Sequence, residues 1–268
     1  MLKRGDIGMA IASQFSADAA DRADRPKSSA RPSVIKQLIG RSLRKMGYTL
    51  ARNNPRTKLV CPNIPGWFSV EEAEALYILA ATTSARRILE VGHFLGRSTS
   101  AICEGIRDAG IAIEFNSYDL GFTSADEFVA HYRRVYDTAS FQVPRECDEL
   151  VFSKKKTTSE IAKVHLGRFD LDRFVKLISG DFTVLDRTQY GFIFCDAMHD
   201  HGEIALNLPH VVGASNDDCV WAFHDMTSSN VADVLAMSPA RLIRVVDTLG
   251  IFRFQRHTES SQNMRQDA

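Results

Sequence analysis

Residues 87–99 constrain the fold of this chain more than any other stretch. The apolar run of residues 88–91 leads into a turn that holds Gly92 and Gly96, and a helical pattern follows the turn. A strand, a glycine turn and a helix in this order form nucleotide-binding sites at the carboxyl end of a parallel strand. Glycine lets the backbone approach a ligand, and the start of the helix offers unpaired N–H groups. The stretch therefore predicts an α/β fold with a ligand site at the turn.

The spacing of the turn favours one class of nucleotide. A dinucleotide-binding fold expects G-x-G-x-x-G, but Phe94 stands where the middle glycine would be. Glu90, at the end of the strand, would suit a ligand with a cation or an amine and would repel a pyrophosphate. The motif Glu-x-Gly-x-x-x-Gly-x-Ser resembles the first motif of the class I, Rossmann-like methyltransferases that use S-adenosyl-L-methionine (SAM). That resemblance assigns four residues to cofactor binding: Glu90, Gly92, Gly96 and Ser98.

Two more acids follow predicted strands at positions that suit the same cofactor. Asp119 ends the strand of residues 113–120, 23 residues after the second glycine, where an acid can bind ribose hydroxyls. Asp181 and Phe182 follow the strand of residues 175–179, where the resemblance places the adenine contacts. The alternatives are an Asp that only caps the next turn and a glycine turn that holds no ligand.

Four acidic and histidine side chains follow two further buried strands, residues 191–195 and 219–223. Because the carboxyl ends of adjacent parallel strands meet at one edge of a sheet, we expect these side chains to lie together beside the glycine turn. The first strand is followed by Asp196 and His199, and the second by His224 and Asp225.

Methyl transfer requires side chains of these kinds, since the protein must align the acceptor and help to remove its proton. We expect His199 to be the general base, with His224 as the second candidate and Asp196 as a catalytic partner. A divalent cation such as Mg²⁺, held by Asp196 and Asp225, could instead lower the pKa of the acceptor hydroxyl. Alternatively, each histidine supports a neighbour or caps a helix, and each carboxylate pairs with a cation or an N–H group.

Three motifs together sharpen the resemblance. They are Ile-Leu-Glu-Val-Gly-x-x-x-Gly-x-Ser-Thr, a strand followed by Asp-x-x-His with Glu203 beyond it, and a strand followed by His-Asp. Over residues 66–255 this resembles the small bacterial methyltransferase family with cephalosporin-hydroxylase-like and sugar O-methyltransferase relatives. One departure is that residues 215–218, Ser-Asn-Asp-Asp, replace the Pro-Gly-Gly turn usual in that family. The resemblance implies O-methylation of a sugar or another small-metabolite hydroxyl. A non-catalytic binding or scaffold domain and an NAD-dependent oxidoreductase remain as alternatives.

The fold predicted for residues 61–257 is a methyltransferase domain. We expect a Rossmann-like, doubly wound and mostly parallel seven-stranded sheet with an antiparallel last strand. Ser69 and Glu72 form a capping box that opens a helix before the first strand. Residues 242–246 and 251–255 predict a closing antiparallel hairpin.

Residues 121–173 are long for a connection between two strands. They predict helices at residues 124–136 and 158–166, with a polar and irregular stretch at residues 144–156 between them. Long connections at this edge often shape a substrate pocket, so we expect a helical cap.

Charge divides the chain unequally. Residues 1–60 hold 13 Lys and Arg but only 4 Asp and Glu, which leaves 20 against 29 in the rest. This basic extension predicts one amphipathic helix at residues 33–47, followed by a proline-rich linker at residues 53–65. Such a helix suits an anionic membrane surface, its own domain or a second subunit, and the last two are favoured. We expect a small-molecule acceptor, a homo-oligomer, no nucleic-acid partner and a loose tail at residues 258–268.

The number and spacing of the cysteines indicate the cellular compartment of the protein. There are five of them, scattered and without a C-x-x-C pair, so neither a disulfide framework nor a zinc site is predicted. No apolar run approaches the roughly 18–20 residues of a membrane span, and no signal-peptide pattern opens the chain. These features predict a cytoplasmic protein with free thiols.

Overall fold

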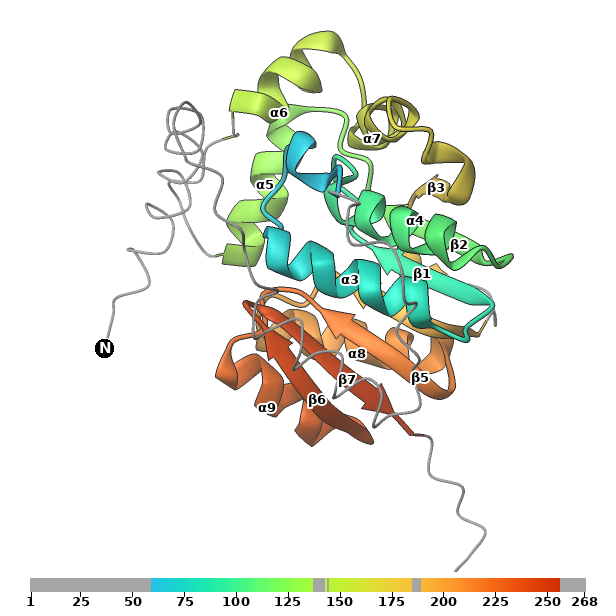
Figure 1. The fold of residues 1–268 in the computed structure, drawn as a ribbon. Coiled ribbons are helices and arrows are strands. Elements are labelled where there is room, and N and C mark those ends of the chain that lie inside the picture. Colours follow the sequence, from blue (N-terminus) through green and yellow to red (C-terminus); the bar gives the residue numbers. More distant parts are fainter. Residues whose placement is uncertain (1–58, 137–142, 144, 185–188, 256–268) are drawn as a thin grey trace, which may run out of the picture.

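Seven strands form one sheet through the centre of the computed structural model, in the order β3-β2-β1-β4-β5-β7-β6 (Figure 1). Neighbouring strands from β3 to β5 are parallel, whereas β7 runs antiparallel to both β5 and β6. The predicted sheet with its antiparallel last strand is therefore confirmed. The strands are β1 Arg87–Val91, β2 Glu114–Asp119, β3 Lys176–Ser179, β4 Tyr190–Cys195, β5 Ser215–Phe223, β6 Ala240–Val246 and β7 Leu249–Phe254.

The structure describes residues 59–136, 143, 145–184 and 189–255. The predicted basic helix at residues 33–47 and the predicted tail at residues 258–268 lie outside this part of the chain. Within it, no helix is long and apolar enough to cross a membrane.

The end of the predicted linker belongs to the core. Leu59, Cys61 and Ile64 are buried, and Cys61–Asn63 forms the short 3₁₀-helix η1. The linker prediction was therefore wrong at this end, because apolar side chains between the prolines pack against the domain.

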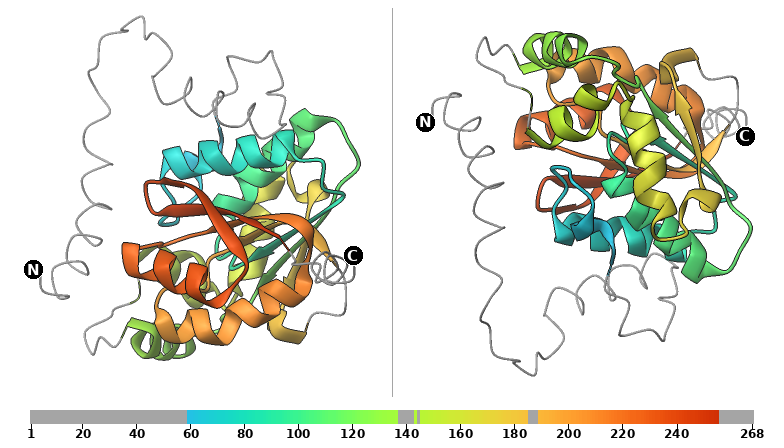
Figure 2. Two further views of the ribbon diagram at one scale, coloured as in Figure 1. Left: turned by 90° about the horizontal axis from the view of Figure 1, so that it is seen from below. Right: turned by 90° about the horizontal axis from the view of Figure 1, so that it is seen from above.

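Helices cover both faces of the sheet (Figure 2). α3 (Val70–Thr82) and α4 (Arg97–Ala109) pack together on one face, and α8 (His201–Ala214) and α9 (Ser228–Met237) pack together on the other. The predicted capping box is present at the start of α3, where the Ser69 side chain accepts the N–H of Glu72 and the Glu72 side chain accepts the N–H of Ser69. A Cβ on Gly105 of α4 would lie 2.6 Å from the carbonyl oxygen of Tyr77 in α3, so this glycine allows the two helices to pack closely.

Alternating side chains of the strands divide the core between the two faces. Ile88 and Phe192 point into the core beneath α3 and α4, whereas their neighbours Leu89 and Ile193 point into the core beneath α8. The strands nearest the middle of the sheet are thus buried on both faces, as expected for parallel strands between helices.

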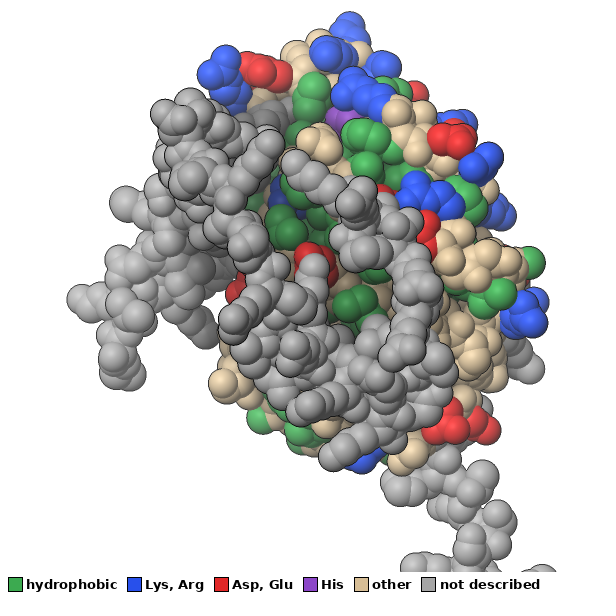
Figure 3. Space-filling model, viewed as in Figure 1, with side chains coloured by type: hydrophobic (Ala, Val, Ile, Leu, Met, Phe, Trp, Pro, Cys, Tyr) green, Lys and Arg blue, Asp and Glu red, His purple; other side chains and the backbone are tan. Residues whose placement is uncertain are grey.

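The connection between β2 and β3 is more helical than predicted. It holds α5 (Ala125–Tyr136), α6 (Arg145–Leu150), the 3₁₀-helix η2 (Phe152–Lys154), α7 (Thr158–Gly167) and the 3₁₀-helix η3 (Asp172–Phe174). The predicted irregular stretch was wrong, because Cys147 and Val151 are buried in a cluster with Phe128, and this packing stabilises α6. Lys and Arg side chains gather over the top of the molecule, above these helices (Figure 3).

β5 begins at Ser215, four residues before the predicted start. Ser215 pairs with Tyr190 of β4, and its hydroxyl accepts a hydrogen bond of 2.7 Å from the indole N–H of Trp221. The residues that replace the Pro-Gly-Gly turn therefore extend the strand, while the strand still ends at Phe223 as predicted.

Candidate active site

The glycine turn lies directly after β1, at the carboxyl edge of the sheet. Gly92 and Gly96 both have left-handed backbones, with φ of 89° and 93°. A Cβ on Gly92 would lie 2.9 Å from the backbone oxygen of Asp196, so glycine lets the turn approach the end of β4. Phe94 also has a positive φ, 44°, which is rare for a bulky residue and clusters at functional sites. The turn thus brings the predicted cofactor loop against the predicted catalytic acid.

Glu90, the fourth residue of β1, has no exposed surface. Its carboxylate accepts hydrogen bonds from the hydroxyls of Ser98 and Thr99, both at 2.7 Å, and of Ser117 at 2.6 Å. Burial raises the pKa of Glu90 to about 7, although the three hydroxyls favour the ionised form. Two of the predicted cofactor residues, Glu90 and Ser98, are therefore bonded to each other, and Glu90 orders the first turn of α4.

His93, in the glycine turn, was not predicted as a site residue. It is buried, with Nδ1 3.0 Å from Oγ of Ser117 and Nε2 2.9 Å from Oγ of Ser159. Because the Ser117 hydroxyl donates to Glu90, it accepts from Nδ1–H, and Nε2 then accepts from Ser159. Burial lowers the pKa of His93, in agreement with this neutral tautomer.

Asp119 ends β2 and lies against the glycine turn. Its Oδ2 accepts the backbone N–H of Phe94 at 2.8 Å. Its Oδ1 accepts the N–H of Gly121 at 2.8 Å and the hydroxyl of Thr158 at 3.0 Å. A carboxylate has about four acceptor positions, so Oδ2 keeps one for a further donor. Asp119 therefore fixes the turn and the start of α7, and one acceptor position of Oδ2 remains.

Asp181 and Phe182 follow β3, as predicted, but they face different surroundings. Asp181 is exposed and accepts the N–H of Thr183 at 2.9 Å. Phe182 is 6% exposed and lies in the core of the α8 face, with its ring 6.1 Å from that of His210. Asp181 is thus available to a ligand at this edge, whereas Phe182 mainly packs.

The predicted catalytic and metal residues lie together at the ends of β4 and β5. Nδ1 of His224 lies 2.9 Å from Oδ1 of Asp196, and Nε2 of His199 lies 3.5 Å from the same oxygen. Nε2 of His199 also lies 3.9 Å from Oδ2 of Asp225. Desolvation favours a neutral acid, but the two imidazoles, that of His224 above all, hold the pKa of Asp196 well below its usual range.

His199 lies between three carboxylates. Besides Asp196 and Asp225, its Nδ1 lies 2.6 Å from Oε2 of Glu203, one turn along α8. Burial alone would lower the pKa of His199, but the hydrogen bonds with Asp196 and Glu203 raise it to about 10. In this arrangement His199 is an imidazolium, and it must first lose its proton to act as a base.

His224 is 5% exposed, and carboxylates face both of its ring nitrogens. Nδ1 bonds Asp196, and Nε2 lies 3.4 Å from Oε2 of Glu72 in α3. The Asp196 carboxylate outweighs burial and holds the pKa of His224 well above its usual value. A ring held at both nitrogens is a poor candidate for a base that must reach an acceptor.

Asn230, at the start of α9, ties the two loops of this edge together. Its amide donates to the carbonyl oxygens of both His199 and Asp225, each at 3.1 Å. Asp225 has a left-handed backbone with φ of 54°, and the bond from Asn230 holds it there. The sequence contained no local signal for this role, since Asn230 lies beyond the motif that it supports.

The same edge offers a set of donors for a metal ion. One ligand atom from each of Asp196, His199 and Asp225 lies within 4.8 Å of the others. Two imidazoles are surrounded by four carboxylates, those of Glu72, Asp196, Glu203 and Asp225. Even with both rings protonated, this group carries two surplus negative charges, so its donors and its charge suit a divalent cation.

The sequence profile of one protein family, described as a methyltransferase domain, matches residues 89–226, just over half of the chain. The chain belongs to this methyltransferase family. The matched residues run from β1 through the turn after β5 and include every residue predicted for the site. Its Rossmann-like sheet has the architecture of class I methyltransferases.

Solved structures of methyltransferases are similar to this one at low sequence identity. An S-adenosylhomocysteine-bound methyltransferase from Podospora anserina is 14% identical, with a TM-score of 0.48, over 85% of this chain and 100% of that one. A SAM-dependent O-methyltransferase from Thermotoga maritima is 13% identical, with a TM-score of 0.48, over 86% of this chain and 74% of that one. An O-methyltransferase from Bacillus cereus is 14% identical, with a TM-score of 0.43, over 92% of this chain and 97% of that one. No curated protein matches the sequence significantly.

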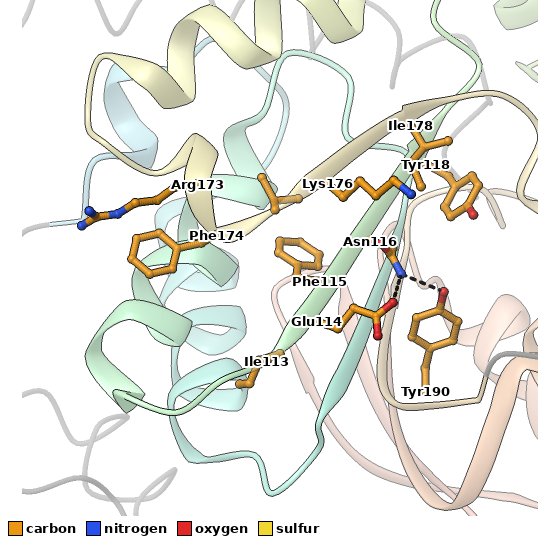
Figure 4. A pocket seen from close by; sticks show the side chains of 11 residues that line it. Ile113, Glu114, Phe115, Asn116, Tyr118, Arg173, Phe174, Lys176, Ile178 and Tyr190 are labelled. Carbon is orange, nitrogen blue, oxygen red and sulfur yellow. Dashed lines mark hydrogen bonds between the residues drawn. The ribbon is translucent and has the colours of Figure 1, made fainter.

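A cavity of about 440 Å³ lies elsewhere in the methyltransferase, along β2 and β3 (Figure 4). Within it, the amide of Asn116 donates to Oε1 of Glu114 at 3.1 Å and to the hydroxyl of Tyr190 at 3.2 Å. None of the predicted site residues lines this cavity, so we do not assign it to the active site.

Proposed function

We propose that this methyltransferase transfers the methyl group of SAM to a hydroxyl of a small-molecule acceptor, such as a sugar or another small metabolite. The observation that carries the proposal is that Asp196 lies directly against the glycine turn at Gly92, with His199 and Asp225 beside Asp196. A hydroxyl is a poor nucleophile until it loses its proton, and acids with an imidazole are the groups that hold and remove that proton.

The carboxyl ends of β1, β2 and β3 would hold the cofactor, and the glycine turn from Gly92 to Gly96 would lie against it. The remaining acceptor position on Asp119 suits a ribose hydroxyl, and exposed Asp181 suits the adenine amino group. Glu90 would act through Ser98, whose hydroxyl donates to Glu90 and keeps its lone pairs for the methionine amine. Phe182 would support the adenine end from the core.

His199 is the better candidate for the general base. Its ring is 13% exposed, whereas the His224 ring is 5% exposed and is held at both nitrogens. His199 also contacts Asp196 and Asp225 at once, so it lies where an acceptor hydroxyl would meet both acids.

We further propose that Asp196 and Asp225 hold a divalent cation, with Nε2 of His199 close enough to be a third ligand. Carboxylates suit Mg²⁺, and an added imidazole also suits Mn²⁺. A bound cation would lower the pKa of the acceptor hydroxyl. If Nε2 of His199 is a ligand, the cation takes the place of its proton, and the acceptor proton would pass to solvent rather than to His199.

Calorimetry with S-adenosylhomocysteine, with NAD⁺ as the control ligand, tests the cofactor assignment. We expect the former to bind at micromolar concentration and NAD⁺ not to bind. Asp119→Ala should weaken binding by about tenfold, since it removes both a ligand contact and the anchor of Phe94. Binding of NAD⁺ alone would refute the assignment. A radioactive methyl-transfer assay on sugars and small hydroxyl compounds, with and without chelator, then tests the acceptor class and the cation.

The basic segment at residues 33–47 gives a second, separate proposal. We propose that it contacts another subunit or an anionic membrane surface, and that the protein is a homo-oligomer. Light scattering and vesicle sedimentation of the full chain, compared with a variant in which Lys36, Arg41 and Arg44 are glutamate, test both. A variant with unchanged mass and unchanged vesicle binding would refute the proposal.

A further inference from the structure

Glu72 of α3 lies outside the residues that match the methyltransferase family and outside the predicted site. It is 1% exposed. Its Oε2 accepts the backbone N–H of Ser69 at 2.8 Å and lies 3.4 Å from Nε2 of His224. Its Oε1 accepts the N–H of Thr248, in the turn between β6 and β7, at 3.1 Å and the Thr248 hydroxyl at 2.7 Å. One carboxylate therefore joins α3, the closing hairpin and the end of β5.

A second capping box in the same chain shows what capping alone requires. At the start of α7, Oε2 of Glu160 accepts the N–H of Thr157 at 2.8 Å, and Oγ1 of Thr157 accepts the N–H of Glu160 at 3.1 Å. The corresponding bonds of α3 are 2.8 Å and 3.2 Å, yet Glu160 is exposed and Glu72 is not. Capping accounts for one oxygen of Glu72, and it does not explain the burial or the contacts with Thr248 and His224.

The ring of His224 is held on three sides. Nδ1 faces Asp196, Nε2 faces Glu72, and the Phe68 ring lies against it with the centroids 5.0 Å apart at an angle of 49°. A half-turn of the imidazole about its Cβ–Cγ bond would put carbon atoms in both nitrogen positions. The contact with Glu72 therefore adds to that with Asp196 in selecting the ring orientation in which Nδ1 bonds Asp196.

We propose that Glu72 is a positioning residue for methyl transfer, which holds the His224 ring in the orientation that fixes the Asp196 carboxylate towards the acceptor. This rests on the proposed function, in which Asp196 serves the acceptor and a divalent cation. Removing such an outer contact typically costs about 10- to 100-fold in metal affinity or in activity.

Mn²⁺ titration of the full chain, followed by electron paramagnetic resonance, tests the proposal. Glu72→Leu should raise the Kd for Mn²⁺ by about 10- to 100-fold. Glu72→Gln should stay within about threefold of the wild type, because its amide oxygen can still accept from Nε2–H; the amide NH2 then donates to the Thr248 hydroxyl, and only the bond from the Thr248 N–H is lost. If Glu72→Gln is as weak as Glu72→Leu, charge and not orientation is responsible, and the proposal fails. If Glu72→Leu does not fold, Glu72→Asp replaces it, because the shorter side chain cannot both cap α3 and reach His224.

Two control variants separate positioning from stability. Ser69→Ala removes the capping hydroxyl, and Thr248→Val removes the hydroxyl bonded to Oε1, but neither removes a group that contacts His224. Both should lower the melting temperature and leave the Kd for Mn²⁺ within about threefold of the wild-type value. If they weaken Mn²⁺ binding as strongly as Glu72→Leu does, the effect is general destabilisation and the proposal is wrong.

A second measurement does not depend on the cation. In the NMR spectrum of the wild type, the Nδ1 proton of His224 should give a slowly exchanging resonance that His224→Asn removes. It should persist in Glu72→Gln and in both controls, and it should be lost in Glu72→Leu. A wild type that binds no Mn²⁺ but shows this pattern would refute the cation and support the role of Glu72. A folded Glu72→Leu protein that keeps the resonance would overturn the proposal.

Discussion

At the ends of β1 and β2, Glu90 is bonded to three hydroxyls, whereas at the ends of β4 and β5, Asp196 lies between two imidazoles. Each half of this edge contains an acid and a histidine. In the first half, burial raises the pKa of Glu90 to about 7 and lowers the pKa of His93, so burial shifts both groups towards their neutral forms. In the second half, the carboxylates raise the pKa of His199 to about 10 and the imidazoles lower that of Asp196, so both are charged.

The pKa values shift in opposite directions because the hydrogen-bond partners differ, although both halves contain the same types of residue. Hydroxyls can donate or accept without adding charge, so burial decides the outcome around Glu90 and His93. Around Asp196, each charged group lies within about 4 Å of an opposite charge, and attraction outweighs burial. The end of β1 is therefore lined by polar groups that burial shifts towards neutrality, while the ends of β4 and β5 carry paired charges.

Of the substitutions that test this difference, Asp196→Asn should have the largest effect on stability and activity. It leaves the imidazolium rings of His199 and His224 without their shared carboxylate, so we expect a loss of about 3–5 kcal/mol in the free energy of unfolding. Methyl transfer to an acceptor should fall by about 100-fold or more. Urea unfolding at pH 7 measures the first effect, and the radioactive assay measures the second.

Asp233→Asn is the matched control for that change. Asp233 of α9 pairs with His201 at 3.1 Å, but His201 is 74% exposed. Its loss should cost less than about 1 kcal/mol, because solvent already screens the pair. If the two variants lose equal free energy of unfolding, the ion pairs of Asp196 stabilise the protein no more than an exposed surface pair does.

The contrast between the halves was only partly predictable from the sequence. Local patterns predicted the strand, glycine turn and helix at Gly92, the capping box at Ser69, and the acids that follow each strand. The charge states depend on contacts between distant residues: Thr248 and Glu72 are 176 positions apart, and His93 and Ser159 are 66 apart. No periodicity or spacing specifies such contacts, because they form only when the elements pack together.

The same limit explains two errors outside the site. The residues of α6 are polar enough to suggest a loop, but buried Cys147 and Val151 hold them as a helix. The prolines before α3 suggested a linker, yet Cys61 and Ile64 lie in the core. In both places a few apolar side chains decide the structure, and the average composition of the segment hides them.

Glu90→Gln should change how the stability of the protein depends on pH. Burial raises the pKa of Glu90 from its usual 4.5 to about 7, so folding favours the protonated acid. This group therefore contributes stability below pH 4.5, and the contribution is lost as the pH rises through 7. Because glutamine stays neutral, the variant should gain about 3 kcal/mol relative to the wild type between pH 4.5 and pH 8. Urea unfolding at several pH values measures this change.

Thr99→Val provides the companion to that experiment. It removes one hydroxyl that favours the ionised form of Glu90 and keeps the shape of the side chain. The pKa of Glu90 should then rise further, so the decline in stability that begins near pH 4.5 should continue to a higher pH than in the wild type. A stability difference between Glu90→Gln and wild type that does not vary with pH would contradict the view that burial sets the state of this half.

Ser159→Ala should have the smallest effect. The Ser159 hydroxyl donates to Nε2 of neutral His93, and its loss leaves that nitrogen buried without a donor, at a cost of about 1–2 kcal/mol in the free energy of unfolding. Ser179→Ala is the control, since the Ser179 hydroxyl only donates to Ser159 and Ser179 itself is exposed. Its loss should cost less than about 0.5 kcal/mol by urea unfolding, because water can replace it. If Ser159→Ala costs as little as the control, His93 does not depend on this donor. The neutral half would then be set by Ser117 and Glu90 alone.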